Sequence, residues 1–589
     1  MKTVVFLDIC PKIFGWILRV RWAGKKGVRK VFRPFSFVLL SLALGLPTST
    51  YQSTFREMNQ LYYGDNLYVL RECIATESVD LIYLDPPFNS QRDYNLLFKT
   101  PKGHRSEAQI EAFKDSWHWG EQAEREFDEL LHQPNTDVAQ MMHALRAFLG
   151  VNDMMAYLTM MANRLLELHR VLKPNGSLYL HCDPTASHYL KVVLDGVLGK
   201  LNYRNEIIWK RTLPHGNQTR KYGSSHDVIF FYAKTDRTTW NGSFHAHREE
   251  YLTEFYKHKE PDGRIYRLIS CINPNPNRPN LTYEWNGVMR VWKYTKERMK
   301  RMHDEGLIVY SKNGVASYKG YLDQMKGMPT QDIWDDIFPL MGSSEERLGY
   351  PTQKPLALLE RIISASSNEG DVVLDPFCGC GTAVDAAQKL KRPWIGIDIT
   401  HLAISLIEKR LKDRYGAKCK FEVHGTPKDI EAARDLARRD KYQFQWWAVS
   451  LVNAQPFQGR KKGADTGIDG IKYFHDADKE GARKIIASVK GGEHVGPAMV
   501  KDLIATIARD QAEIGLFITL SEPTKAMTAE AAAAGFYESA TGKKYPRLQI
   551  LTIEGLLSGK ERAEHPDQLP DMNFKKAPTE QSSRQEELL

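Results

Sequence analysis

The stretch VVLDPFCGCGT, at residues 372–382, points more directly to the architecture of this 589-residue chain than any other segment. An apolar β-branched run, a glycine-containing turn and a helix expected over residues 383–390 form the first half of a βαβ unit of the dinucleotide-binding kind. A second apolar run, WIGID at residues 394–398, ends in Asp398, which lies 23 residues beyond Asp375. This is close to the spacing at which such folds bind ribose hydroxyls. The pattern predicts an adenosine-bearing cofactor, although the glycines alone would also suit a purely structural strand, turn and helix.

A second motif, DPPF at residues 85–88, ends the apolar run VDLIYL at residues 79–84. An acid, two prolines and an aromatic ring at a strand end suit the binding of a flat base that carries an amino group. Asp85 and the carbonyl of Pro86 would accept hydrogen bonds from that group, and Phe88 would stack on the ring. Each proline lacks an N–H and fixes φ, so the turn is stiff and its carbonyl groups can accept. For this string alone, an ordinary proline turn is the alternative.

Together the two motifs resemble those of the DNA amino-methyltransferases, which use S-adenosylmethionine. The order, DPPF before DPFCGCGT, is similar to the β group of that family, a circular permutation of the methyltransferase fold. Further blocks between residues 51 and 423 resemble family segments: YGD at 63–65, LKPNGSLYLHCD at 172–183, NEIIWKR at 205–211, HDVIFFY at 226–232 and PTQKP at 351–355. One departure is Cys380, where the family usually has Ser or Thr, residues of similar size.

The resemblance implies a role for each motif residue. The residues expected to hold the target base at the catalytic turn are Asp85, Pro86, Pro87 and Phe88. The residues expected to hold S-adenosylmethionine are Asp65, Lys354, Asp375, Phe377, Gly379, Gly381, Thr382 and Asp398. The expected partner is double-stranded DNA, whose target base must leave the duplex to reach such a pocket, at a cost of a few kcal/mol.

The expected chemistry follows from the electronic character of an aromatic amine. Its lone pair is delocalised into the ring, so the group is a poor nucleophile until hydrogen bonds to Asp85 and the Pro86 carbonyl localise that pair on nitrogen. A positively charged sulfonium then needs only in-line alignment, and positioning supplies much of the rate. Neither a metal nor a covalent enzyme intermediate is required, so we expect Cys378 and Cys380 to be packing residues.

The target base and the reaction class have alternatives. In the family, a leading Asp usually accompanies adenine N6 and a leading Ser accompanies cytosine N4, so Asp85 favours adenine. Cytosine presents a similar amidine edge and stays an alternative. Methylation of RNA is another alternative, and a non-catalytic DNA-binding protein with a vestigial cofactor pocket is one from outside enzyme chemistry.

The C-terminal part carries a separate pattern, GIDG at residues 467–470 followed by the strand KIIASVK at residues 484–490. This resembles the PD-(D/E)xK-like catalytic domain of Mrr-like restriction endonucleases. There Asp469, at the end of one strand, would hold Mg2+, and Lys490, at the end of the next, would activate water. Ser488 stands where that family has Gln or Glu. Because a hydroxyl is a weaker metal ligand than a carboxylate, an active nuclease and a DNA-binding relic are both open.

These patterns predict an α/β architecture: a circularly permuted Rossmann-like class I methyltransferase with a target-recognition insertion, followed by a C-terminal α/β domain. The expected parts are a basic and apolar extension at 1–50, the target-base half at 51–233, the target-recognition region at 234–332, the cofactor half at 333–425, a linker at 426–445, the nuclease-like domain at 446–562 and a disordered tail at 563–589. Tryptophans and tyrosines of the recognition region are expected to pack its core more often than to contact bases. The polar segment 89–95 is expected to form a mobile loop.

Composition indicates the partners and the cellular compartment that can be expected for the protein. The net charge is +9, but residues 1–50 hold nine Lys and Arg against one acid, which leaves +1 for the other 539 residues. The apolar stretch within residues 35–47 is shorter than the roughly 20 residues that span a bilayer. Together with the basic run before it, this stretch imitates a secretory signal. We interpret residues 1–50 as a non-essential extension, and a membrane-surface anchor is the alternative. Seven cysteines without regular spacing suggest a reducing compartment. We therefore expect a cytoplasmic protein with no membrane partner, whose oligomeric state, a homodimer included, is undecided.

Overall fold

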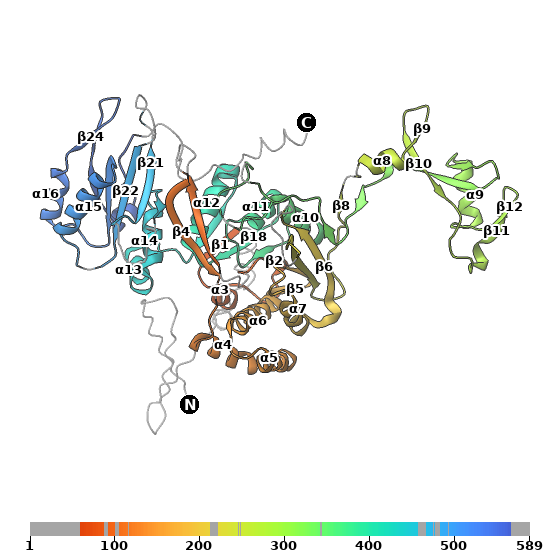
Figure 1. The fold of residues 1–589 in the computed structure, drawn as a ribbon, viewed down its shortest axis with the longest axis horizontal. Helices are drawn as coiled ribbons and strands as arrows, with labels where there is room; N and C mark the ends of the chain where they lie inside the picture. The colour runs from red at the N-terminus through yellow and green to blue at the C-terminus, as the bar shows by residue number, and fades with distance from the viewer. Residues whose placement is uncertain are drawn as a thin grey trace, which may run out of the picture.

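The chain is described from a computed structural model (Figure 1). The structure describes residues 59–87, 92–99, 105–115, 117–212, 222–245, 247, 249–341, 344–350, 352–457, 467–474, 476, 483–492 and 494–566, with the backbone alone for 92–99 and 105–115. The predicted extension at 1–50, Phe88 and the tail beyond 566 lie outside these residues. The described chain forms a central α/β body, a projecting lobe and a C-terminal α/β unit (Figure 1). None of the described helices has the length and apolar character needed to cross a membrane.

The body is built on a single sheet. In the described residues its nine strands follow the order β16-β6-β7-β5-β2-β17-β18-β1-β19. Their bounds are β1 Asn59–Tyr63, β2 Val79–Leu84, β5 Leu172–Cys182, β6 Tyr203–Lys210, β7 His226–Ala233, β16 Ile333–Trp334, β17 Val373–Asp375, β18 Trp394–Asp398 and β19 Phe421–His424. β7 runs antiparallel to β5 and β6, whereas all the other neighbours run parallel. Every residue of β2 is buried, as is typical of a strand covered on both faces.

The strand order confirms the predicted permuted Rossmann-like architecture. Although β2 and β17 lie far apart in the sequence, they are direct neighbours, with Leu81 paired to Val373 and Ile82 to Leu374. β17 pairs with β18, which in turn pairs with β1. The strands that carry the two decisive motifs therefore end at the same edge of one sheet.

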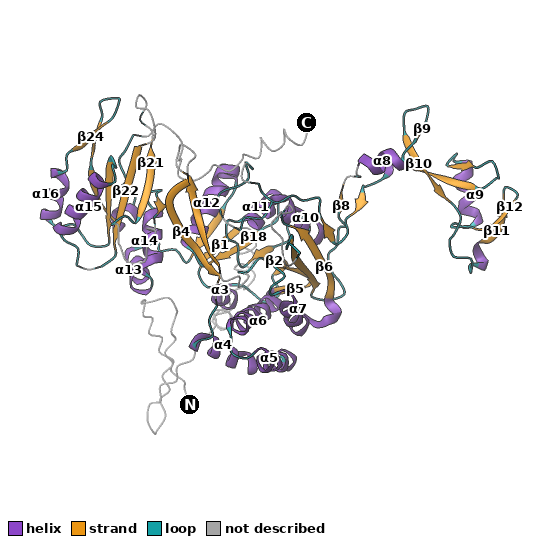
Figure 2. Ribbon diagram, in the orientation of Figure 1, coloured by secondary structure: helices purple, strands orange, loops and turns teal. Residues whose placement is uncertain are grey.

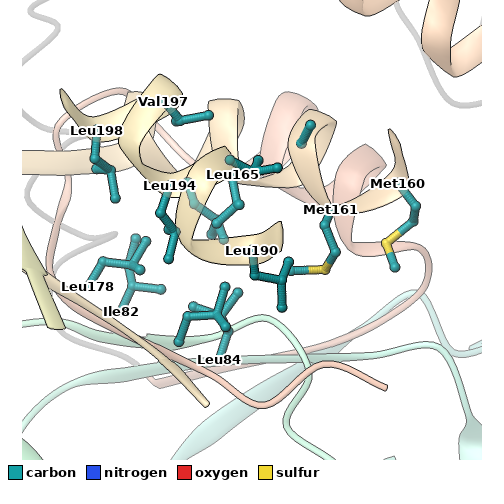
Figure 3. Packing of buried hydrophobic residues seen from close by; sticks show 14 of the residues in the cluster. Ile82, Leu84, Met160, Met161, Leu165, Leu178, Leu190, Leu194, Val197 and Leu198 are labelled. Atoms are coloured by element: carbon teal, nitrogen blue, oxygen red, sulfur yellow. The ribbon is translucent and has the colours of Figure 1, made fainter. Parts of the chain in front are cut away.

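Helices cover both faces of this sheet (Figures 1 and 2). One layer holds α3 Asn66–Cys73, α4 Glu121–Leu131, α5 Thr136–Leu149, α6 Asp153–Val171 and α7 Ser187–Leu194; the other holds α10 Leu356–Ser366, α11 Thr382–Lys389 and α12 His401–Tyr415. Figure 3 shows Ile82 and Leu84 of β2 facing Leu190 of α7 in the first layer. Burying each such side chain contributes about 1.5–3 kcal/mol, so apolar packing holds the motif-bearing strands in place.

A lobe projects from the body between β7 and β16, far to the right in Figure 1. Its stalk is two-stranded, with β8 Phe244–His245 paired antiparallel to β15 Met328–Pro329. Beyond the stalk lie α8 Glu249–Phe255, β9 His258–Lys259, β10 Ile265–Ser270, β11 Thr282–Trp285, β12 Val288–Val291, α9 Lys296–Asp304, β13 Ile308–Tyr310 and β14 Ala316–Tyr321. Trp292 is fully buried in the core of the lobe beside Cys271 and Met299. For this aromatic residue, the prediction of core packing is confirmed.

The chain after the DPP turn forms a hairpin. β3 Arg92–Lys99 pairs antiparallel with β4 Arg105–Asp115, so a strand begins inside the segment 89–95. The prediction of a polar loop was therefore wrong from Arg92 onward. Hydrophilic composition indicated a loop, whereas the Tyr, Leu and Phe residues of β3 favour a strand once a partner strand is available.

The C-terminal unit is a smaller α/β structure. In the described residues its sheet follows the order β20-β21-β22-β23-β26, with β20 Gln455–Pro456, β21 Gly470–Phe474, β22 Arg483–Lys490, β23 Ile514–Thr519 and β26 Leu548–Thr552. Residues 426–445, expected as a linker, carry α13 Ile430–Arg439 and the start of α14 Lys441–Ser450. Leu436 and Phe444 of these helices are buried in the core of the unit, so its packing begins well before residue 446.

Candidate active site at the carboxyl edge of the sheet

The two predicted corners meet at the carboxyl ends of β2 and β17. Asp85 directly follows β2, and Asp375 is the last residue of β17. Because these strands pair in parallel, their ends lie at the same edge of the sheet. The pKa of Asp375 is raised well above its usual value by burial and by the negative charges of Asp85 and Asp398. Three neighbouring strands thus bring three carboxyl groups to one place.

The two carboxylate oxygens of Asp85 have different surroundings. Oδ2 forms an ion pair with the ammonium group of Lys354. Oδ1 is buried and has no hydrogen-bond partner among the described residues. Leaving a buried acceptor unsatisfied costs roughly 1–3 kcal/mol, so this oxygen is suited to the hydrogens of a ligand. Pro86 and Pro87 continue the turn, and Phe88 lies outside the described residues.

Lys354 lies beside the proline turn. It is buried just before α10, and its Nζ also lies 3.5 Å from the carbonyl oxygen of Thr352. The resemblance implied a cofactor contact for this residue. Its ammonium group pairs with Asp85, on the side of the site where the base is expected, and its charge also acts on Asp375 beside the glycine turn, so the cofactor contact stays a prediction.

The turn after β17 requires glycine at two positions. Gly379 has φ +51° and Gly381 has φ +75°, a region that other residues rarely adopt. A Cβ on Gly381 would lie 2.7 Å from a side-chain carbon of Ile407, and a Cβ on Gly379 would lie 3.2 Å from the Tyr350 ring. The positive φ angles and the short distances from a Cβ to its neighbours therefore both favour glycine at these two positions. Thr382 then begins α11.

The two cysteines of this turn are buried. Burial raises the pKa of both thiols, and for Cys378 the carboxyl groups of Asp398 and Asp375 raise it further. Thiols in such surroundings stay protonated near neutral pH and are poor nucleophiles. This supports the interpretation of Cys378 and Cys380 as packing residues.

Asp398 connects the glycine turn to α12. Its Oδ2 accepts the backbone N–H of Gly379 at 2.9 Å, and its Oδ1 accepts the backbone N–H of Thr400 at 2.9 Å and the Thr400 hydroxyl at 2.8 Å. Burial raises the pKa of Asp398 to about 6 in spite of these donors. On the other side of the turn, Phe377 donates its backbone N–H to Asp375 at 3.0 Å. The ionised Asp398 carboxylate retains lone pairs that could accept ribose hydroxyls.

Asp65 has a structural role at the end of β1. Its carboxylate caps α3 by accepting the backbone N–H of Tyr68 and forms an ion pair with Arg164 at 2.7 Å. The next residue, Asn66, accepts a hydrogen bond from Arg164 at 2.6 Å and donates its amide to the carbonyl of Pro376 at 2.8 Å. Asn66 and Arg164 thus tie the β1 corner to the glycine turn. Sequence reasoning missed both residues, because their partners lie far away along the chain.

The C-terminal unit reaches this edge through α14. His401, the first residue of α12, stacks on Tyr63 of β1 with ring centroids 3.6 Å apart, and burial lowers the pKa of His401 to about 3. Gln443 of α14 accepts the backbone N–H of His401 at 3.4 Å. The second unit therefore touches the segment that carries Asp398.

The predicted metal ligand of the C-terminal unit directly precedes β21, which corrects its expected place at a strand end. Because β21 and β22 are antiparallel, Asp469 still lies beside the end of β22. Its Oδ2 accepts the backbone N–H of Val489, the residue before Lys490, at 2.7 Å and lies 3.5 Å from the Ser488 hydroxyl. Within the described ranges, no group of three or more His, Cys, Asp or Glu residues is arranged to hold a metal ion.

Two family models match the chain. One, described as DNA methylase, matches residues 79–409. The other, described as NACHT-associated inactive Restriction Endonuclease 1, matches residues 445–558.

Relatives resemble the chain over about half of its length. The type II methyltransferase M.EcaI of Enterobacter cloacae is 30% identical over 259 residues, which are 43% of this chain and 57% of the relative. The type III restriction-modification enzyme StyLTI Mod subunit of Salmonella typhimurium is 26% identical over 350 residues, or 56% of this chain and 50% of the relative. The chain thus spans little more than half the length of these two. The DNA adenine methyltransferase YhdJ of Escherichia coli is 24% identical over 356 residues, or 60% of this chain and 83% of the relative.

A solved structure of M1.HpyAVI in complex with S-adenosylmethionine is 16% identical, with a TM-score of 0.28, and the match covers 60% of this chain and 98% of that chain.

Proposed function

The chain belongs to the DNA methylase family, and on that premise we propose that it transfers a methyl group from S-adenosylmethionine to the N6 amino group of adenine in double-stranded DNA. The observation that carries this proposal is Oδ1 of Asp85, buried and without a donor among the described residues. An exocyclic amino group is a donor of the kind this oxygen needs. The carbonyl of Pro86 would accept its second hydrogen.

The proline turn acts on the amine by hydrogen bonding. Lys354 occupies Oδ2 of Asp85, so the carboxylate presents Oδ1 to the base. Hydrogen bonds to Asp85 and Pro86 hold both amino hydrogens and return the lone pair to nitrogen, which makes the amine a better nucleophile. Because these acceptors are fixed before the base arrives, they act without reorganisation. Asp85 is also the nearest acceptor for the proton that the methylated nitrogen releases.

The residues around the glycine turn fit S-adenosylmethionine, which supplies a methyl group on a positively charged sulfur. Asp398 offers carboxylate oxygens to ribose hydroxyls, and Gly379 allows the backbone to approach the ligand closely. The carboxylate of Asp85 favours a cation at this edge. We further assign to the cofactor site Phe377, Gly381 and Thr382, which form the turn, and Asp65, which acts through Arg164.

Adenine is proposed over cytosine because the turn begins with Asp85, and similarity to a relative named DNA adenine methyltransferase supports it. The test is to incubate duplex DNA with S-adenosylmethionine labelled in its methyl group, digest the product to nucleosides and separate them. We expect the label in N6-methyladenine. Label in N4-methylcytosine would identify cytosine, not adenine, as the target base, and the proposed methyl transfer would stand.

Two competing functions are separated by the same reagents. Calorimetry measures whether the protein binds S-adenosylmethionine, and a non-catalytic DNA-binding protein would not bind it. Transfer of label to duplex DNA and not to RNA separates DNA methylation from RNA methylation. Transfer to RNA alone would overturn the proposed substrate.

We propose that the lobe, within the recognition region 234–332, contacts the DNA. α9 buries Met299 and Met302 in the lobe and exposes Lys296 and Lys300 to solvent. Exposed lysines suit phosphate contacts, each of which adds to the salt dependence of binding. Replacing both lysines by Ala should weaken DNA binding and lower its salt slope by about 2. The exposed Lys418, in the body, is a control position where the same change should leave the slope unaltered.

We propose that the C-terminal unit does not cut DNA, so that methylation stands alone in this chain. Ser488 replaces a carboxylate or amide ligand, and the matching family model is described as inactive. The test incubates unmethylated and methylated plasmids with the protein and Mg2+. Mg2+-dependent cutting that disappears in Asp469→Ala or Lys490→Ala would overturn this proposal.

A further inference from the structure

A row of buried polar side chains crosses the sheet directly below the proline turn. The hydroxyl of Tyr83 lies 2.9 Å from Nδ1 of His181, and Nε2 of His181 lies 3.1 Å from Oδ2 of Asp227. Oδ1 of Asp227 lies 3.0 Å from a guanidinium nitrogen of Arg211. These residues come from β2, β5, β7 and the end of β6, which are consecutive neighbours in the sheet.

The row is polar and lies within a largely apolar interior. Tyr83, His181 and Asp227 are all nearly or fully buried, and only Arg211 reaches solvent, with 34% of its side chain exposed. Burial opposes ionisation of Asp227, yet its pKa lies below the usual range because His181, Lys354 and Arg211 stabilise the charge. Burying such a network adds little to net stability compared with apolar packing. A role in fixing one arrangement of side chains is the better explanation.

The bonding pattern gives each member a fixed orientation. An ionised carboxylate can only accept hydrogen bonds, so Nε2 of His181 carries the hydrogen and donates a hydrogen bond to Asp227. A second hydrogen bond joins Nδ1 of the same ring to the hydroxyl of Tyr83. His181 is held further by the edge of its ring against Trp209, with centroids 5.7 Å apart. Neither ring can rotate without breaking a buried hydrogen bond.

The row ends beside the catalytic turn. Tyr83 stands two residues before Asp85. Burial raises the pKa of the Tyr83 hydroxyl and the charge of Asp85 raises it further, so the two side chains lie near each other. Leu84 is the last residue of β2, and the turn begins at Asp85. Holding Tyr83 therefore fixes the last stretch of backbone before the acceptor oxygen.

We propose that Tyr83, His181 and Asp227, anchored by Arg211, are positioning residues that set the alignment of the Asp85 turn for the target base. None of them touches the base or the cofactor, and they act through the strand end that carries Asp85. The proposal rests on the proposed methyl transfer. A small displacement of Asp85 would leave substrate binding largely intact and slow the transfer step, because near-attack geometry is sensitive to errors of about 1 Å.

The test compares two buried tyrosines that are paired in register. Tyr83→Phe removes a hydroxyl bonded to His181. Tyr179→Phe removes a hydroxyl bonded to Ser366 at 2.7 Å, from the residue opposite Tyr83 on β5. Both changes delete one buried hydroxyl and should lower Tm similarly. We expect Tyr83→Phe to lower kcat by about 10- to 100-fold with KM for DNA and Kd for S-adenosylmethionine within about twofold, and Tyr179→Phe to leave kcat within about twofold of the unmodified protein.

A double-mutant cycle makes the test specific to the row. If Tyr83 and Asp227 act through one chain of bonds, Tyr83→Phe combined with Asp227→Asn should lower kcat little more than the more damaging single change. Equal kcat values for Tyr83→Phe and Tyr179→Phe, or multiplicative effects in the cycle, would overturn the positioning role while methyl transfer stands. An unmodified protein that methylates no nucleic acid would overturn both proposals.

Discussion

An acid lies beside the end of a strand in both the body and the C-terminal unit, and the surroundings of the two acids differ. In the body, Oδ2 of Asp85 pairs with Lys354 while Oδ1 is buried without a donor in the described chain. In the C-terminal unit, Oδ2 of Asp469 accepts the backbone N–H of Val489. Asp85 has two acidic companions on neighbouring strands, whereas Asp469 has Ser488. An acid beside a strand end therefore indicates a catalytic site only when one of its oxygens is left to accept from a ligand and when the companion groups are present.

The largest expected effect removes the free acceptor. Asp85→Ala should lower methyl transfer by at least about 100-fold, because a fixed hydrogen-bonding group at a reacting centre contributes on this scale. Labelled transfer to duplex DNA measures it. Since Asp85→Ala leaves the charge of Lys354 buried, Asp85→Ala with Lys354→Met serves as the better-folded comparison. Full activity in this double variant would show that Asp85 is not needed for methyl transfer, so that it would differ in no functional respect from Asp469.

A smaller loss is expected at the lysine of the same pair. Lys354→Met should lower kcat by about 10-fold because Asp85 loses the partner that orients it, while Kd for S-adenosylmethionine stays within about twofold. Lys354→Arg, which keeps the positive charge, should recover part of kcat. Calorimetry distinguishes a residue that orients Asp85 from one that binds the cofactor. A large rise in the Kd for S-adenosylmethionine in Lys354→Met would show that Lys354 contributes to cofactor binding.

The third effect concerns stability and pH at Asp398. Its pKa of about 6 in the folded protein lies above the usual 3.8, so its contribution to stability is fully present below about pH 4 and is lost as the pH rises through 6. Asp398→Asn does not titrate. From pH 5 to pH 7.5, the free energy of unfolding of the unmodified protein should therefore fall relative to Asp398→Asn by roughly 1.4 kcal/mol. Urea unfolding at both pH values measures this difference, and a constant difference would contradict the raised pKa.

The smallest effect is expected in the C-terminal unit. Asp469→Ala and Lys490→Ala should leave methyl transfer within about twofold, because these side chains lie outside the carboxyl edge where Asp85 and Asp398 meet and such distant changes act independently. The assay is the same labelled transfer at matched protein concentration. A loss comparable with that of Asp85→Ala would show that the two units share one reaction.

Sequence patterns predicted the parts of the fold that depend on local residues. The strands ending at Leu84, Asp375 and Asp398 were predicted correctly, because apolar β-branched runs followed by glycine or proline turns favour few other structures. The β3–β4 hairpin was not predicted, because a polar composition was taken for a loop. A helical interpretation up to Arg439 agrees with α13, whereas the packing of α13 and α14 into the C-terminal unit was not foreseen. Patterns along the chain could not show which partners meet across the sheet. The pairing of Lys354 with Asp85, and of His181 with Tyr83, depends on the strand order.

The antiparallel pairing of β8 with β15 has an evolutionary consequence. It brings the entry and exit of the lobe together, with His245 opposite Met328, so the intervening segment is attached to the sheet at one point. Genetic exchange of that segment between related chains would leave both ends joined and the catalytic edge undisturbed. If the lobe contacts DNA as proposed, recombination of this segment would change which DNA sequence is bound and leave the residues proposed for methyl transfer unchanged.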